Sequence, residues 1–102
     1  MSDAAPVSQA QRELQQADAV FAALAHPARR QILLSVWYRD GTSAGEIAQR
    51  FECSWPTTSR HLAKLVQAGL LQATRQGRQR HYRVVDQVVR DVLSRWLSYF
   101  ES

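Results

Sequence analysis

Residues 54–85 contain six arginine and lysine residues and no acidic residue. The rest of the chain has more acidic than basic residues, so this third of the sequence supplies more than the whole net charge of +4. Within this stretch, the residue pattern of a helix is followed by the patterns of two strands. The sequence therefore predicts a basic helix beside a basic hairpin. Such a surface is what binding to a phosphate backbone requires. A solvated basic face without a partner is the alternative, but it does not explain why acids are missing only here.

Residues that begin and end helices divide the chain. The expected helix starts are Pro27 in a first turn, the capping box of Ser43 and Glu46, Ser54 as an N-cap, and Asp86 as an N-cap. Gly69 is the expected left-handed end of a helix, and Gln76–Gly77 is the expected turn of a hairpin. The predicted helices are residues 8–24, 27–38, 43–51, 55–68 and 86–100, and the predicted strands are residues 70–74 and 80–85.

The element order α-α-α-α-β-β-α predicts a mainly α fold with a β-hairpin wing (α+β), that is, a winged helix-turn-helix. A chain of 102 residues forms one domain. We expect residues 1–17 to be an N-terminal arm, partly helical or frayed, and residues 18–102 to be the DNA-binding and dimerisation domain.

Bulk composition narrows the class of protein further. The chain lacks an apolar run long enough to span a membrane and a signal-peptide layout at its start, and the single Cys53 cannot form an internal disulfide. These features indicate the cytoplasm. The pI near 10.0 fits an anionic partner, for which a membrane surface would also qualify. No catalytic triad, phosphate loop or ligand cluster with workable spacing is present, which argues against an enzyme.

Helix 55–68 has two distinct faces when projected at 100° per residue. The face expected to pack on the core holds Thr58, Leu62, Leu65 and Val66. The opposite face holds Pro56, Thr57, Arg60, Lys64 and Gln67. Arginine can contact guanine through two hydrogen bonds, and threonine can contact thymine or phosphate, so the second face is typical of a recognition helix. An ordinary amphipathic surface helix is the alternative, although it would usually include acidic residues.

Two residues of this helix are open to several interpretations. His61 lies at the flank between the two faces. It could be a polar surface residue or a phosphate contact. A metal ligand is the third option, although a lone histidine on a helix flank is more often a polar surface residue. Trp55 either fills the gap between two helices or reaches a DNA groove.

The hairpin carries Arg75, Arg78, Arg80 and Arg83 without an acidic neighbour, which favours contact with the DNA backbone or the minor groove. Tyr82 and Val84 alternate with these arginines and should pack inward. Arg83 is nearest the body, where an acid such as Asp86 could pair with it.

The last helix has more apolar surface than so small a domain can bury against its own core. Self-association would cover this surface, and the expected dimer interface consists of Val88, Val92, Trp96, Tyr99 and Phe100.

Several motifs together resemble the ArsR/SmtB-type winged-helix regulators. They include Glu46–Ile47–Ala48, the run from Ser54 to Leu62 with its Pro-Thr-Thr-Ser-Arg-His-Leu ending, and the wing from Gly77 to Arg83. The resemblance covers about residues 18–85. It implies a homodimeric bacterial repressor that dimerises through its first and last helices. It also implies that DNA is bound by a set of eight residues: Ser54, Trp55, Thr57, Ser59, Arg60, His61, Arg78 and Arg80. The charge pattern adds Lys64 and Arg75 to this set.

The chain departs from the metal-sensing members of that family. Paired cysteines that bind soft metals in relatives correspond to Ser43 and Gly45, and the Asp, His, His and Glu of zinc sites correspond to Asp86, Val88, Tyr99 and Ser102. We therefore expect no metal site and no cofactor. Redox sensors need a cysteine pair, so Cys53 is interpreted as a buried inert thiol rather than a sensor.

The sequence thus predicts a dimeric, cytoplasmic repressor that binds an inverted repeat in double-stranded DNA, with no membrane partner and an unknown effector. Helix 55–68 would enter the major groove and the wing, residues 71–85, would contact the backbone or minor groove. A winged helix that binds an acidic protein is the alternative.

Overall fold

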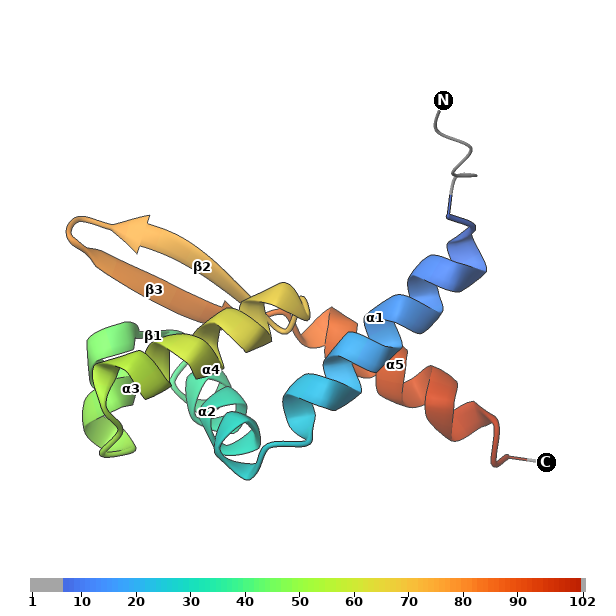
Figure 1. Cartoon of the computed structure of the whole chain (residues 1–102), viewed down its shortest axis with the longest axis horizontal. Coiled ribbons are helices and arrows are strands. Elements are labelled where there is room, and N and C mark those ends of the chain that lie inside the picture. The colour runs from blue at the N-terminus through green and yellow to red at the C-terminus, as the bar shows by residue number, and fades with distance from the viewer. Residues whose placement is uncertain (1–6, 102) are drawn as a thin grey trace.

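The computed structural model describes residues 7–101, which form five helices and a small antiparallel sheet (Figure 1). The helices are α1 (Gln9–Leu24), α2 (Pro27–Tyr38), α3 (Ala44–Arg50), α4 (Trp55–Gln67) and α5 (Asp86–Ser98). The strands are β1 (Thr42–Ser43), β2 (Leu71–Gln76) and β3 (Gln79–Val84). The predicted winged helix-turn-helix and its element order are confirmed, with β1 as an additional strand.

Side-chain caps start the first four helices. Ser8 and Gln11 form a reciprocal capping box at α1, and His26 accepts a hydrogen bond from the Ala28 backbone N–H at the start of α2. Ser43 caps α3, and Ser54 caps α4. α1 continues without a break through Asp18, where the boundary between arm and domain was placed, and residues 1–6 of that arm lie outside the described part of the chain.

The start of α5 differs from the prediction. Its N-cap is Val85, which makes no side-chain capping bond, and Asp86 is already the first helical residue. Asp86 accepts a hydrogen bond from Arg90 at 2.9 Å instead of bonding a backbone N–H. The predicted Asp86 cap is therefore wrong, because the helix starts one residue earlier and the carboxylate pairs with Arg90 one turn along it.

The sheet has the order β1-β3-β2, with both pairings antiparallel. In the hairpin, Leu71 pairs with Val84 at the base and Gln76 with Gln79 at the tip. Gly77, with a φ of 63°, and Arg78 therefore form the turn, one residue later than predicted. β1 is only two residues long and exists because Thr42 and Ser43 pair with Tyr82 and His81.

The core lies where α1, α2, α3, α4 and the base of the hairpin meet, and α5 adds Val92 to it. Its fully buried large side chains are Val20, Ile32, Val36, Ile47, Thr58, Leu62, Leu65 and Leu70. Tyr82 is buried as predicted, and Val84 is half-buried against the same core. Val66, expected on the core side of α4, is instead exposed. α1 and α5 lie side by side at the end of the molecule opposite the hairpin tip (Figure 1).

Candidate nucleic-acid interface

The N-terminal end of α4 is fixed by its own hydroxyl groups. Ser54 Oγ accepts a hydrogen bond from the Thr57 backbone N–H at 3.4 Å and donates one to Thr57 Oγ1 at 3.0 Å. Thr58 Oγ1 donates to the Ser54 carbonyl oxygen at 3.0 Å. These bonds cap the first turn of α4 and define where the helix starts, and therefore which residues its first turn presents.

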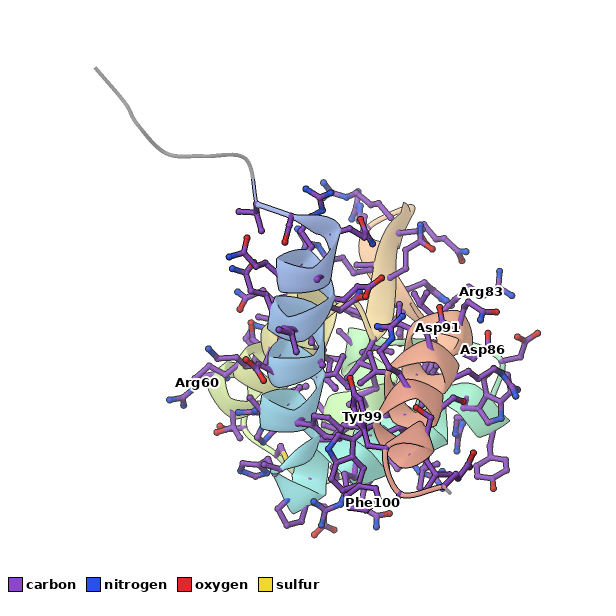
Figure 2. All side chains as sticks on the ribbon, turned by 90° about the vertical axis from the view of Figure 1, so that its right-hand side faces the viewer. Arg60, Arg83, Asp86, Asp91, Tyr99 and Phe100 are labelled. Carbon is purple, nitrogen blue, oxygen red and sulfur yellow. The ribbon has the colours of Figure 1, made fainter. Side chains whose placement is uncertain are left out.

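Most of the residues expected to bind DNA at α4 are open to solvent. Ser54, Trp55, Ser59, Arg60 and Lys64 are exposed, whereas Thr57 is half-buried beside the Ser54 cap. The Arg60 side chain projects away from the body of the protein (Figure 2). α4 contains no acidic residue, so this surface attracts anions.

The wing supplies a second exposed basic surface. Arg75 and Arg80 are direct partners across the hairpin, and Arg78 lies in the turn; all three are exposed. Side chains of directly opposed residues lie within about 5.5 Å at Cβ, so Arg75 and Arg80 concentrate positive charge on a short ribbon. Arg83 does not belong to this basic surface: its guanidinium pairs with Asp40 at 3.4 Å, whereas Asp86, the partner that the sequence suggested, pairs with Arg90.

A groove of about 570 Å³ separates α4 from the wing. Trp55 and Ser59 line it from α4, Arg75, Arg78 and Arg80 from the wing, and Ala44 and Gly45 from the start of α3. We refer to this space as the α4–wing groove. Trp55 is 56 % exposed, so the interpretation in which it fills the gap between two helices is wrong. The sequence did not predict Ala44 and Gly45 at the site. The start of α3 lies beside the wing because β1, which directly precedes α3, pairs with β3.

His61 does not lie on the exposed flank of α4. It is 7 % exposed, and Arg29 Nε donates a hydrogen bond to its Nδ1 at 3.3 Å. The His26 ring packs edge-on against it, with ring centroids 4.6 Å apart. Burial lowers the pKa of the His61 imidazole, and His26, Arg29 and Arg60 lower it further. The expected surface position of His61 is therefore corrected, and this histidine connects α4 to α2.

The α1–α5 end carries a large exposed apolar surface. Trp96 packs edge-on against Phe21 of α1 and against Phe100, with centroid distances of 5.7 and 4.9 Å. Trp96 is still 51 % exposed, and Tyr99 and Phe100 are each 70 % exposed. Figure 2 shows Tyr99 and Phe100 at the C-terminal end of α5, facing α1. We call this the α1–α5 surface.

Val92 and Val88 differ from the prediction for this surface. Val92 is 2 % exposed and belongs to the protein's own core, and Val88 is half-buried beside Gly69. The expectation that Val92 contacts a second chain is wrong, because its side chain is buried within the single chain. The exposed part of the predicted interface is Trp96, Tyr99 and Phe100.

Between residues 7 and 101, no group of three or more His, Cys, Asp and Glu side chains converges as a metal site would require. Of the positions compared with zinc-binding relatives, Asp86 is paired with Arg90, Tyr99 is exposed, and Ser102 lies outside the described residues. Cys53 is half-buried, and its Sγ donates to the Phe51 carbonyl oxygen at 3.4 Å. No helix in the described part of the chain is long and apolar enough to cross a membrane.

Comparison with known proteins agrees with this geometry. A family described as a helix-turn-helix domain matches residues 24–72. The chain is 32% identical over 88 residues to the HTH-type transcriptional regulator YgaV of Escherichia coli, covering 86% of this chain and 89% of that protein. It is 37% identical over 81 residues to the transcriptional repressor SdpR of Bacillus subtilis, covering 79% and 88%.

A solved structure is similar over nearly the whole chain. It is the solution structure of the homodimeric winged helix-turn-helix DNA-binding domain of a possible ArsR-family transcriptional regulator from Mycobacterium bovis. The TM-score is 0.73 at 27% identity, and the alignment covers 96% of this chain and 91% of that one. The fold and the basic surface define a DNA-binding transcriptional regulator. The chain belongs to the ArsR-type family of winged helix-turn-helix regulators.

Proposed function

We propose that this regulator is a homodimeric repressor that binds an inverted repeat in double-stranded DNA. In each protomer, α4 enters the major groove with Arg60, Ser59 and Trp55 toward the bases. Ser54, Thr57 and Lys64 contact phosphates near the same groove. Arg75, Arg78 and Arg80 of the wing contact the backbone or the adjacent minor groove.

The separation of two surfaces supports this proposal. The basic surfaces of α4 and the wing flank one groove, and the α1–α5 surface lies away from the wing tip (Figure 1). A second copy can therefore cover the exposed aromatic residues without approaching the basic face. A two-fold pair then presents two recognition helices to successive turns of the duplex.

The relatives support the remaining parts of the proposal. The Mycobacterium bovis domain is homodimeric, and SdpR is a repressor, so dimerisation and repression fit this chain as well. The protein acts in the cytoplasm, where the chromosome is accessible, and functions by occupying DNA rather than by catalysis. It requires no metal or cofactor, because the residues that hold metals in relatives are replaced here by Ser43, Gly45, Val88 and Tyr99.

Selection of binding sites from a random duplex pool tests the proposal. The wild-type protein should select an inverted repeat whose half-sites lie about one helical turn, or a multiple of one turn, apart. Fluorescence anisotropy on that duplex should show an affinity that falls steeply with salt, with a slope that measures the number of phosphate contacts.

Arg90→Gln is the matched control, since it removes one positive charge from α5, outside the α4–wing groove. There Arg90 pairs with Asp86. It should leave the salt slope unchanged, whereas Arg78→Gln should reduce it by about one unit per protomer. If the protein selected no DNA sequence and instead bound an acidic protein in a salt-sensitive way, the alternative would be favoured, in which the winged helix binds an acidic protein.

A further inference from the structure

Trp55 is an exposed apolar side chain at the edge of a cationic groove. Its neighbours along the α4–wing groove are Ser59, Tyr82 and three arginines, and more than half of the indole is open to solvent. The side chain of Ser54, and not that of Trp55, caps the start of α4. An indole in this position leaves a large apolar face without a partner within the protein.

The position of Trp55 on α4 directs the indole toward DNA. Trp55 is the first residue of α4, and the N-terminal residues of a recognition helix approach base edges most closely. Ser59 follows four residues later on the same helix face and lines the same groove. The indole therefore lies at the N-terminal end of α4, on the side of the helix that faces the wing.

We propose that Trp55 selects thymine in each half-site by packing its indole against the thymine 5-methyl group. This inference rests on the proposed DNA-binding function and adds a specificity-determining residue to it. The thymine methyl is the apolar group that the base pairs present in the major groove. Cytosine offers an amino donor at the neighbouring position, and the indole has a single N–H donor and no acceptor to satisfy it. Trp55 thus favours thymine over cytosine.

Removal of single methyl groups tests this directly. In the site that the wild-type protein selects from the random pool, each thymidine is replaced in turn by deoxyuridine, which lacks only the methyl group. We expect one position in each half-site to lose affinity about fourfold, the effect of burying one methyl-sized group. In Trp55→Ala, the same replacement should change affinity less than 1.5-fold (a threshold on the order of the error of a binding assay).

Trp37→Ala is the matched control. Trp37 is also an exposed tryptophan but lies on α2, outside the α4–wing groove. This variant should keep the fourfold methyl effect of the wild-type protein. Retention of the methyl effect in Trp55→Ala, or its absence from every thymine in the wild-type protein, would overturn the proposal. The second result is expected if the indole stacks on a wing arginine and touches no base.

Photo-crosslinking gives a measurement that needs no variant. The methyl-sensitive thymidine is replaced by 5-bromodeoxyuridine, whose bromine occupies the place of the methyl group, and the irradiated complex is digested and mapped by mass spectrometry. An adduct on Trp55 supports the proposal, and an adduct confined to another residue, such as Tyr82, overturns it. These outcomes are distinct from failure of the proposed function, in which the protein would select no site from the pool.

Discussion

The residues of α4 divide between reading and support in a way that helical projection only partly predicts. Thr58, Leu62 and Leu65 pack on the core as expected, and Arg60 is exposed as expected. His61 was placed at the exposed flank, yet it lies against His26 and Arg29. Arg29 lies 32 residues away in sequence, so no local pattern indicates that it will meet His61.

Acidification should destabilise the protein through His61. Its pKa is lowered in the folded state, mainly by burial, so the unfolded chain takes up a proton first as the pH falls. The stability that neutral His61 contributes is fully present above its ordinary pKa of about 6.5 and is lost as the pH falls below that value. Thermal unfolding of the wild-type protein and of His61→Gln at pH 7.5 and 5.5 measures this. Between pH 7.5 and 5.5 the melting temperature should fall less for His61→Gln than for the wild-type protein. An equal fall for both proteins would contradict the prediction.

Arg60 and Arg78 should contribute differently to DNA binding. Arg60 projects from the reading face of α4, so Arg60→Ala should cost about 1–3 kcal/mol and relax base preference at one position in each half-site. Arg78 lies in the turn of the wing, so Arg78→Ala should weaken binding to all duplexes alike. Competition assays with single-base variants of the selected site measure both effects. A change in specificity for Arg78→Ala, with only a change in salt dependence for Arg60→Ala, would reverse the assignment of the two elements.

At the level of elements, signals within a few residues predicted most of the fold. Pro27, Ser43, Ser54 and Gly69 start and end helices where the sequence indicated. β1 was not predicted because two residues have no periodicity, and only pairing with β3 makes them a strand. The α4–wing groove was likewise beyond a sequence pattern, since it depends on how the hairpin lies over α3 and α4.

The end of α4 should be sensitive to any side chain at Gly69. Its φ is 82°, in the left-handed region, and an added Cβ would meet Gln16 Nε2 at 3.6 Å and Val88 at 3.9 Å, which are ordinary contacts. The cost of Gly69→Ala therefore comes from the backbone and should be about 1–2 kcal/mol of unfolding free energy. Urea denaturation measures this value. Gly69→Asn should be milder because asparagine tolerates this conformation, and a larger loss for asparagine than for alanine would contradict the backbone explanation.

At the scale of the whole molecule, the aromatic residues of α1 and α5 form a surface that the single chain leaves open. Trp96 packs against both Phe21 and Phe100, and a cavity of about 340 Å³ lies between α1 and α5. Glu13 and Arg95 form an ion pair at 3.7 Å at the side of the same cavity. A second copy that covers these rings would remove apolar area from water, which is the main source of stability in such interfaces.

Dimerisation through this surface predicts a clear effect of Trp96→Glu. A carboxylate among Phe21, Phe100 and a second chain would be desolvated, and Arg95, the nearby cation, is already paired with Glu13. The variant should therefore be a monomer at concentrations where the wild-type protein is a dimer. Tyr38→Glu is the matched control, because Tyr38 is an exposed aromatic residue at the end of α2, and this variant should remain dimeric. Sedimentation velocity gives the oligomeric state, and circular dichroism establishes that each variant is folded. Monomeric Trp96→Glu should also lose its preference for an inverted repeat over a single half-site, since only a dimer engages both halves at once. A folded, dimeric Trp96→Glu with unchanged affinity for the repeat would place the dimer interface on another surface of the protein.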